Sequence, residues 1–144
     1  MGPGGELTVH ILMMAFCEHA RLRPDGKLDI HGAFHDLAAP AFPAKQDEMV
    51  LVVALEWDPA DAGRYQFKVD LVGGGPHPSF SVNGETEVGG GGADGRPGRT
   101  YLVMPLKDIV FPAPGTYRLE LRIKGRTHAG PPLHLWQVAE PGAH

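Results

Sequence analysis

The chain has a single cysteine, Cys17, no excess of positive charge and no long apolar run. One cysteine excludes an intramolecular disulfide framework and a cysteine-rich zinc module. Thirteen basic against seventeen acidic residues give a formal net charge of −4, which offers no basic surface to nucleic acid or to an anionic membrane. Residues 1–6 carry neither a secretion signal nor a myristoylation pattern. We therefore expect a cytoplasmic protein with no nucleic-acid or membrane partner.

A helical pattern is also lacking, because no window of about eleven residues is amphipathic with a 3.6-residue period and free of glycine and proline. Apolar and polar side chains instead alternate along residues 65–71 and 117–123, which is typical of antiparallel strands with one face in water. Residues 49–57 are apolar at almost every position, which predicts a central strand covered on both sides. Further strands are expected at residues 7–22, 27–37, 101–106 and 133–138.

The length of 144 residues is that of one domain. Strands without helices predict a single all-β domain over residues 1–144, an antiparallel β-sandwich of about seven or eight strands, immunoglobulin-like or C2-like. A closed β-barrel is the alternative. Residues 73–99 hold ten of the twenty glycines, and we interpret this glycine-rich region as two loops flanking an edge strand at residues 79–82.

A hairpin is predicted by residues 23–27, Arg-Pro-Asp-Gly-Lys, which fit a type I turn with Gly26 in the left-handed conformation. In this register opposed residues sum to 50, so the even positions face the core as the pairs Leu22–Leu28, Ala20–Ile30 and Phe16–Phe34. Glu18 then lies on the core side opposite Gly32, where its carboxylate needs a hydrogen-bond partner. We expect structural roles for Glu18, Gly26 and Gly32.

The same register places one thiol and three imidazoles on the other face of the hairpin, from Cys17, His19, His31 and His35. These groups suit zinc or another late first-row metal. The spacing matches no Cys-x-x-Cys or His-Glu-x-x-His motif, so we favour a polar outer face without a cofactor. No catalytic set emerges, because a cysteine on a regular strand lacks an oxyanion hole, and the acidic residues of segment 58–61 fit a turn better than a calcium site.

The first strand is apolar on both faces. Its odd positions are Leu7, Val9, Ile11 and Met13, and its even positions are Leu12, Met14 and Phe16. Either a bulge near Ala15 switches the faces, or both faces are covered. A twofold homodimer through Leu7, Val9, Ile11 and Met13 is one way to cover the second face, and we expect this interface.

Several segments resemble the N-terminal signature of an uncharacterised bacterial family of small cytoplasmic β-proteins. They are Phe-Cys-Glu-His-Ala-Arg at 16–21, Asp-Gly-Lys-Leu at 25–28, Gly-Ala-Phe at 32–34 and Ala-Pro-Ala-Phe-Pro at 39–43. The Pro-Gly-Thr-Tyr sequence at 114–117, which leads into a late strand, is similar too. The resemblance implies a β-fold and a cytoplasmic location, and it implies no activity.

The sequence names no ligand, and three functions stay open. The expectation that we favour is a non-enzymatic protein-binding or assembly module with an unidentified protein partner. A metal-binding protein that uses the cysteine and histidines of the first hairpin is one alternative. A small enzyme with its site in the glycine-rich region 73–99 is the other.

Overall fold

The computed structural model describes residues 9–89 and 97–139, and every regular element within them is a β-strand. The strands are β1 (His10–Cys17), β2 (His19–Leu22), β3 (Leu28–His31), β4 (Asp36–Ala39), β5 (Ala44–Glu56), β6 (Gly63–Val72), β7 (Phe80–Val88), β8 (Arg99–Phe111), β9 (Gly115–Ile123) and β10 (Arg126–Gln137). The all-β prediction is thus confirmed. No helix in these two ranges is long and apolar enough to cross a membrane.

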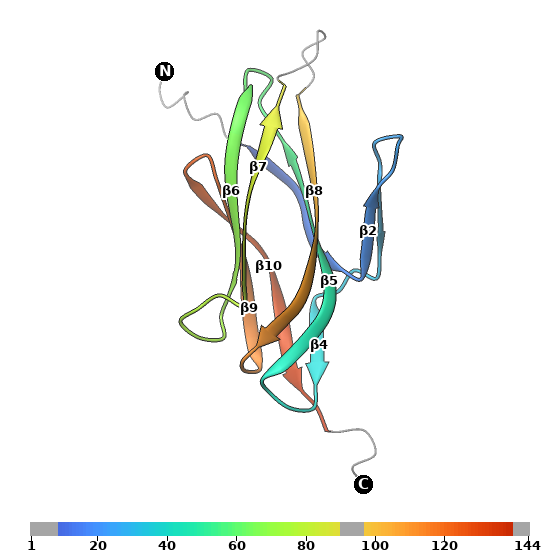
Figure 1. Cartoon of the computed structure of the whole chain (residues 1–144), viewed down its shortest axis with the longest axis vertical. Helices are drawn as coiled ribbons and strands as arrows, with labels where there is room; N and C mark the ends of the chain where they lie inside the picture. The colour runs from blue at the N-terminus through green and yellow to red at the C-terminus, as the bar shows by residue number, and fades with distance from the viewer. Residues whose placement is uncertain (1–8, 90–96, 140–144) are drawn as a thin grey trace.

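The ten strands form three sheets rather than the single set of seven or eight that was predicted. One sheet has the order β1-β5-β8, a second has the order β4-β10-β9-β6-β7, and β2 pairs with β3 alone. The two larger sheets lie on opposite sides of one core (Figure 1). No hydrogen-bonded ladder joins these two sheets within the described ranges, so the closed barrel is wrong. The arrangement is also not wholly antiparallel, because β4 runs parallel to β10.

The predicted hairpin register is confirmed in every pair of β2 and β3, from His19 opposite His31 to Leu22 opposite Leu28. Gly26 has a φ of 86°, and its N–H donates to the carbonyl of Arg23 over 2.9 Å, as the turn chemistry requires. Phe16 and Phe34 also pair as predicted, and their rings stack with centroids 6.2 Å apart.

The hairpin does not continue into the core, which corrects two expectations. After Cys17 the chain leaves the three-stranded sheet, so the even positions of β2 and β3 belong to a separate small sheet outside the core. Leu22 is 49% exposed for this reason. Glu18 is exposed rather than core-facing, and its carboxylate lies directly above Gly32, whose φ is 68°.

A bulge resolves the two-faced pattern of the first strand. The pairing of β1 with β5 shifts between Ile11 and Met13, which is earlier than the predicted position near Ala15. Before the bulge the odd positions Val9 and Ile11 pack with the core, and after it the even positions Met14 and Phe16 do so. Val9 and Ile11 are therefore core residues and not the interface that was expected. Leu7 lies outside the described residues.

The central strand β5 is covered on both faces, as its sequence predicts. Leu51, Val53 and Leu55 are fully buried in the core. Val52 and Ala54, between them, are also buried but do not belong to the core cluster, because they lie on the face turned away from it. The β2–β3 hairpin stands beside this second face, and β2 contacts both β5 and β8 (Figure 1). We call this second face of the β1-β5-β8 sheet the outer face.

The late strands are longer than predicted. The edge strand expected at 79–82 is β7, which extends to Val88 and pairs along its whole length with β6. The last strand begins at Arg126 rather than near residue 133, because Lys124 and Gly125 form a two-residue turn with φ values of 54° and 71°. Positive φ at both central residues is the mark of a type I′ hairpin turn.

Candidate functional site

The cysteine and histidine side chains of the first hairpin do not gather into a site. His19 and His31 are opposite each other and exposed, and His35 is exposed further along the chain. Cys17 is fully buried in β1, and burial raises the pKa of its thiol. In residues 9–89 and 97–139 no three histidine, cysteine or acidic side chains are placed so that they could hold a metal ion together.

The outer face is apolar over all three strands. Met13 is opposite Ala54, Tyr101 is opposite Ala54 on the other side, and Val52 is opposite Val103. Residues that pair directly share a face, so these side chains form one surface. Val52 and Ala54, at the centre of the surface, are buried, whereas its margin is not.

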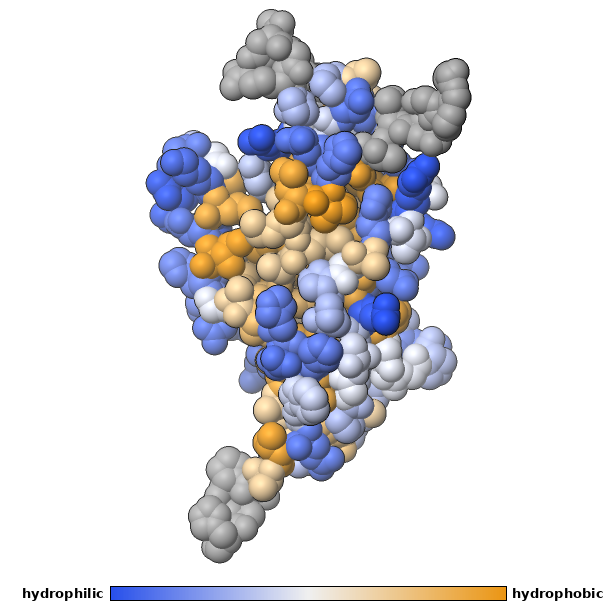
Figure 2. All heavy atoms as spheres, turned by 180° about the vertical axis from the view of Figure 1, so that it is seen from behind, coloured by the Kyte–Doolittle hydropathy of each residue, from blue (hydrophilic) through white to orange (hydrophobic). Residues whose placement is uncertain are grey.

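Large apolar side chains remain exposed at that margin. Leu12 and Met13, at the bulge of β1, are 49% and 38% exposed, and Leu22 of the hairpin is 49% exposed. Figure 2 shows a hydrophobic area on this side of the molecule, with hydrophilic residues around it. An apolar area with a polar rim is typical of a contact surface.

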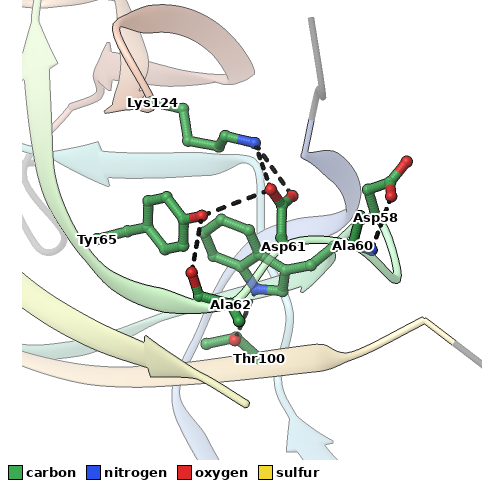
Figure 3. Close-up of polar contacts among 8 residues, drawn as sticks. Asp58, Ala60, Asp61, Ala62, Tyr65, Thr100 and Lys124 are labelled. Carbon is green, nitrogen blue, oxygen red and sulfur yellow. Dashed lines mark hydrogen bonds and ion pairs between the residues drawn. The ribbon is translucent and has the colours of Figure 1, made fainter. Parts of the chain in front are cut away.

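A buried ion pair closes one end of the core (Figure 3). The Lys124 ammonium donates to both carboxylate oxygens of Asp61, over 3.1 and 3.0 Å. The Tyr65 hydroxyl lies 3.4 Å from the same carboxylate, and the Tyr65 ring stacks on Trp57 with centroids 4.7 Å apart. The Trp57 indole N–H donates to Thr100 Oγ1 over 2.8 Å. The cluster thus links β5 and β8 of one sheet to β6 and β9 of the other.

This cluster is built for structure. Asp61 is the one buried charged residue in the described part of the chain, and both of its oxygens are occupied by Lys124. Lys124 also lies 5.9 Å from the Trp57 ring centroid and 5.6 Å from that of Tyr65, at cation–π distances. Sequence reasoning assigned Asp61 to a turn and missed its partner. The available signal was the Lys-Gly pair at 124–125, a hairpin turn flanked by alternating strands.

A broad groove of about 680 Å³ lies on the polar face of β6, β7 and β9. Its lining includes Lys68 and Arg122, which are opposite each other in the ladder, together with Glu85. Arg64 reaches Glu85 over 3.7 Å and Lys68 reaches Asp70 over 3.8 Å. The groove therefore mixes both signs of charge on a solvated sheet face.

Comparison with solved structures relates the fold to a part of much larger proteins. A β-glucosidase from Listeria innocua in complex with gluconolactone matches 94% of this chain, with 8% sequence identity and a TM-score of 0.50. A second structure of the β-glucosidase from Listeria innocua gives the same TM-score of 0.50. The chain spans 16% of the glucosidase chain, and at this identity the likeness concerns the fold alone. The alkylpurine DNA glycosylase AlkC of Pseudomonas fluorescens, bound to DNA with an abasic site analog, matches more weakly, with 10% identity, a TM-score of 0.44, and coverage of 85% of this chain and 30% of that one.

The sequence itself matches one family. None of the curated proteins compared with the chain matches it. The sequence model of a family of unknown function, DUF6941, matches residues 12–135, which include all of β2 to β9 and most of β1 and β10. This match confirms the resemblance to an uncharacterised family. The chain belongs to the family of unknown function DUF6941.

Proposed function

We propose that this protein is a non-enzymatic β-sandwich module whose function is binding and assembly, and that the margin of the outer face is its contact surface. The observation that carries the proposal is the exposure of Leu12, Met13 and Leu22 around an apolar sheet face. A single chain needs only one apolar core, so a second apolar face with exposed large side chains favours a protein partner.

An immunoglobulin-like kind of sandwich is favoured by one local feature. Tyr117 is buried near the start of β9, and its hydroxyl donates to the carbonyl of Ala113 over 2.7 Å. The same hydroxyl accepts from the Ala113 N–H over 3.3 Å. A tyrosine that binds the backbone a few residues upstream resembles the tyrosine corner of Greek-key sandwiches. Such domains are common as binding modules, although the fold itself assigns no function.

The first partner that we propose is a second copy of this chain. Residues 11–17 contain no acidic or basic side chain, although the chain as a whole has a net charge of −4. Two copies can therefore approach through β1 without like-charge repulsion at the contact. A twofold axis makes the same patch serve both subunits, which suits an apolar margin such as Met13 and Leu22.

The oligomeric state tests this proposal. We expect light scattering and sedimentation velocity to show a dimer at high micromolar concentration that dissociates on dilution. Met13→Glu and Leu22→Glu should each weaken the dimer by at least about tenfold, because each places a charge in the contact. Both side chains are exposed in the single chain, so the melting temperature of the dilute variants should stay close to that of the wild type.

A matched control is available on the same sheet. Val110 of β8 is 46% exposed and pairs with Lys45 of β5. Met13 pairs with Ala54, which lies nine residues further along β5. Val110→Glu adds the same charge far from the proposed contact and should leave the dimer intact. A wild-type chain that stays monomeric at high micromolar concentration overturns the second-copy assignment, as does a Val110→Glu variant that dissociates as readily as Met13→Glu.

A further inference from the structure

A second exposed site lies where β9 begins and β10 ends, and no step of the proposed assembly uses it. A cavity of about 330 Å³ is lined there by Pro114, Thr116, His134, Trp136 and Gln137, among others. Trp136 is 57% exposed, although indole is one of the side chains that gain most from burial. Trp136 belongs to the five-stranded sheet and not to the β1-β5-β8 sheet that carries the outer face, so this site is separate from that face.

The exposed indole is held in place. Its Nε1–H donates to Asp36 Oδ1 over 3.1 Å, and Asp36 belongs to β4, which pairs with β10 beside it. The His134 ring lies at a tilt of 34° to the indole, with centroids 6.3 Å apart. A ligand that stacks on this ring does not have to immobilise the ring first, which lowers the cost of binding.

The polar side chains around the indole are each used only in part. His134 Nδ1 is 3.1 Å from Thr116 Oγ1, and its Nε2 has no hydrogen bond to another described residue. Gln137 donates from Nε2 to the carbonyl of Pro40 over 3.2 Å, which leaves its side-chain carbonyl as an acceptor. Asp36 binds the indole through Oδ1 and keeps Oδ2 as a second acceptor. His134 and Thr116 pair in the β9–β10 ladder and Trp136 lies two residues along β10, so their side chains share one face of the sheet, and this places groups that can bind hydroxyls beside the exposed indole.

We infer that this site binds a carbohydrate. The negative face of an aromatic ring attracts the weakly positive C–H groups on the flat side of a pyranose, while the hydroxyls around the ring edge bind polar side chains. The cavity is at the lower end of the usual size range for ligand sites, about 300–1,000 Å³, which suits a mono- or disaccharide unit.

Two other ligand classes fit the same residues less well. A quaternary ammonium prefers a cage of several aromatic rings, and the lining of this cavity provides one indole. A proline-rich peptide packs in a groove between aromatic side chains and accepts hydrogen bonds on its carbonyls, but the indole N–H here already donates to Asp36. A neutral sugar needs neither a cage nor that donor.

The two tryptophans provide a site-specific readout. In a ¹H–¹⁵N spectrum the Trp57 indole N–H, which is buried and bound to Thr100, serves as an internal reference for that of Trp136. The probes are methyl β-glucopyranoside, cellotetraose, xylotetraose, chitotetraose and maltotetraose, each added to about 20 mM. We expect at least one oligosaccharide to shift the Trp136 signal with saturation and to leave that of Trp57 unchanged.

Variants decide whether Trp136 is the platform. Trp136→Ala should weaken binding of the active oligosaccharide by at least about tenfold in calorimetry, and Trp136→Phe should weaken it less, because a smaller ring remains. Leu12→Ala removes an apolar side chain that is also about half exposed, at the other site, and should leave sugar binding unchanged.

Three results overturn the inference. They are no shift of the Trp136 signal with any of the sugars, equal binding by Trp136→Ala and the wild type, and a saturable shift with choline or decaproline where the sugars give none. Dissociation of the dimer has no bearing on this outcome, so the two proposals fail or stand separately.

Discussion

Replacing Asp61 by asparagine should destabilise the fold strongly, because it removes the charge and keeps the shape. The Asp61 side chain is 4% exposed and that of Lys124 is 16% exposed. Removing one partner of a buried pair costs about 3–5 kcal/mol, since it leaves the other charge uncompensated. Lys124 retains some contact with water, so we expect the lower end of that range, about 3 kcal/mol.

The loss is large enough for a simple thermal measurement. An unfolding entropy of about 2.1 cal/mol/K per residue gives roughly 0.3 kcal/mol/K for this chain, so about 3 kcal/mol lowers the melting temperature by about 10 °C. Calorimetry measures the shift, and urea unfolding followed by tryptophan fluorescence gives the free energy independently. Asp29→Asn is the matched control, because Asp29 pairs with Arg21 and Arg23 near the surface and each such pair contributes about 0–1 kcal/mol.

A double variant separates the ion pair from other effects of the substitution. Lys124→Met removes the ammonium and keeps a side chain of similar length, so Asp61→Asn with Lys124→Met should be more stable than Asp61→Asn alone. We expect a coupling of about 2 kcal/mol in the cycle of four proteins. A loss below about 1 kcal/mol for Asp61→Asn, or a double variant no more stable than the single one, would refute the reasoning.

Three further measurements probe the turn, a histidine and the thiol. Gly26→Ala and Gly32→Ala should each cost about 1 kcal/mol in urea unfolding through left-handed strain, since a Cβ added at Gly26 meets nothing within 4 Å and one added at Gly32 meets only the exposed Glu18 side chain, which can rotate away. A loss near zero at either position would contradict this. Burial lowers the pKa of His128, so the folded state binds its proton less readily than the unfolded chain. The contribution of His128 to stability should be fully present above the unfolded pKa of about 6.5 and should fall as the pH drops from there toward the lower folded pKa. His128→Gln should therefore flatten the dependence of urea midpoints on pH between about 7 and 5. Cys17 is fully buried and its thiol pKa is raised, so Ellman's reagent should react with it at the rate of unfolding, and rapid labelling of the native protein would show that β1 opens locally.

The parts of the fold that depend on local chemistry were predictable from the sequence. The turn at residues 23–27 set the hairpin register because proline and glycine fix their own backbone angles, and four pairs followed correctly from it. The alternation of apolar and polar side chains along residues 117–123 predicted β9, because this pattern marks a half-buried strand without information from distant residues. In both cases the information lies within a few residues.

The parts that depend on distant residues were not predictable in the same way. Lys124 adopts a left-handed conformation in a turn that usually takes asparagine or glycine, and its ion pair with Asp61 joins residues 63 positions apart. Trp136 lies in a strand pattern, and its indole is fixed by Asp36, 100 residues away. The Lys-Gly pair at 124–125 signals a turn, but composition and spacing do not pair Lys124 with Asp61 or Trp136 with Asp36.

Two of the four residues expected at the interface, Val9 and Ile11, lie against the core for a structural reason. The sequence contains more apolar strand surface than one core can bury, and that surplus was attributed to the odd positions of the first strand. The bulge between Ile11 and Met13 turns Val9 and Ile11 toward the core, so these two positions do not account for the excess apolar surface. Apolar surface beyond that of one core is nevertheless present, because both faces of β5 are apolar and only one of them packs in the core. The β2–β3 hairpin supplies only part of that cover, and the exposed margin that remains is the consequence of a doubly apolar central strand.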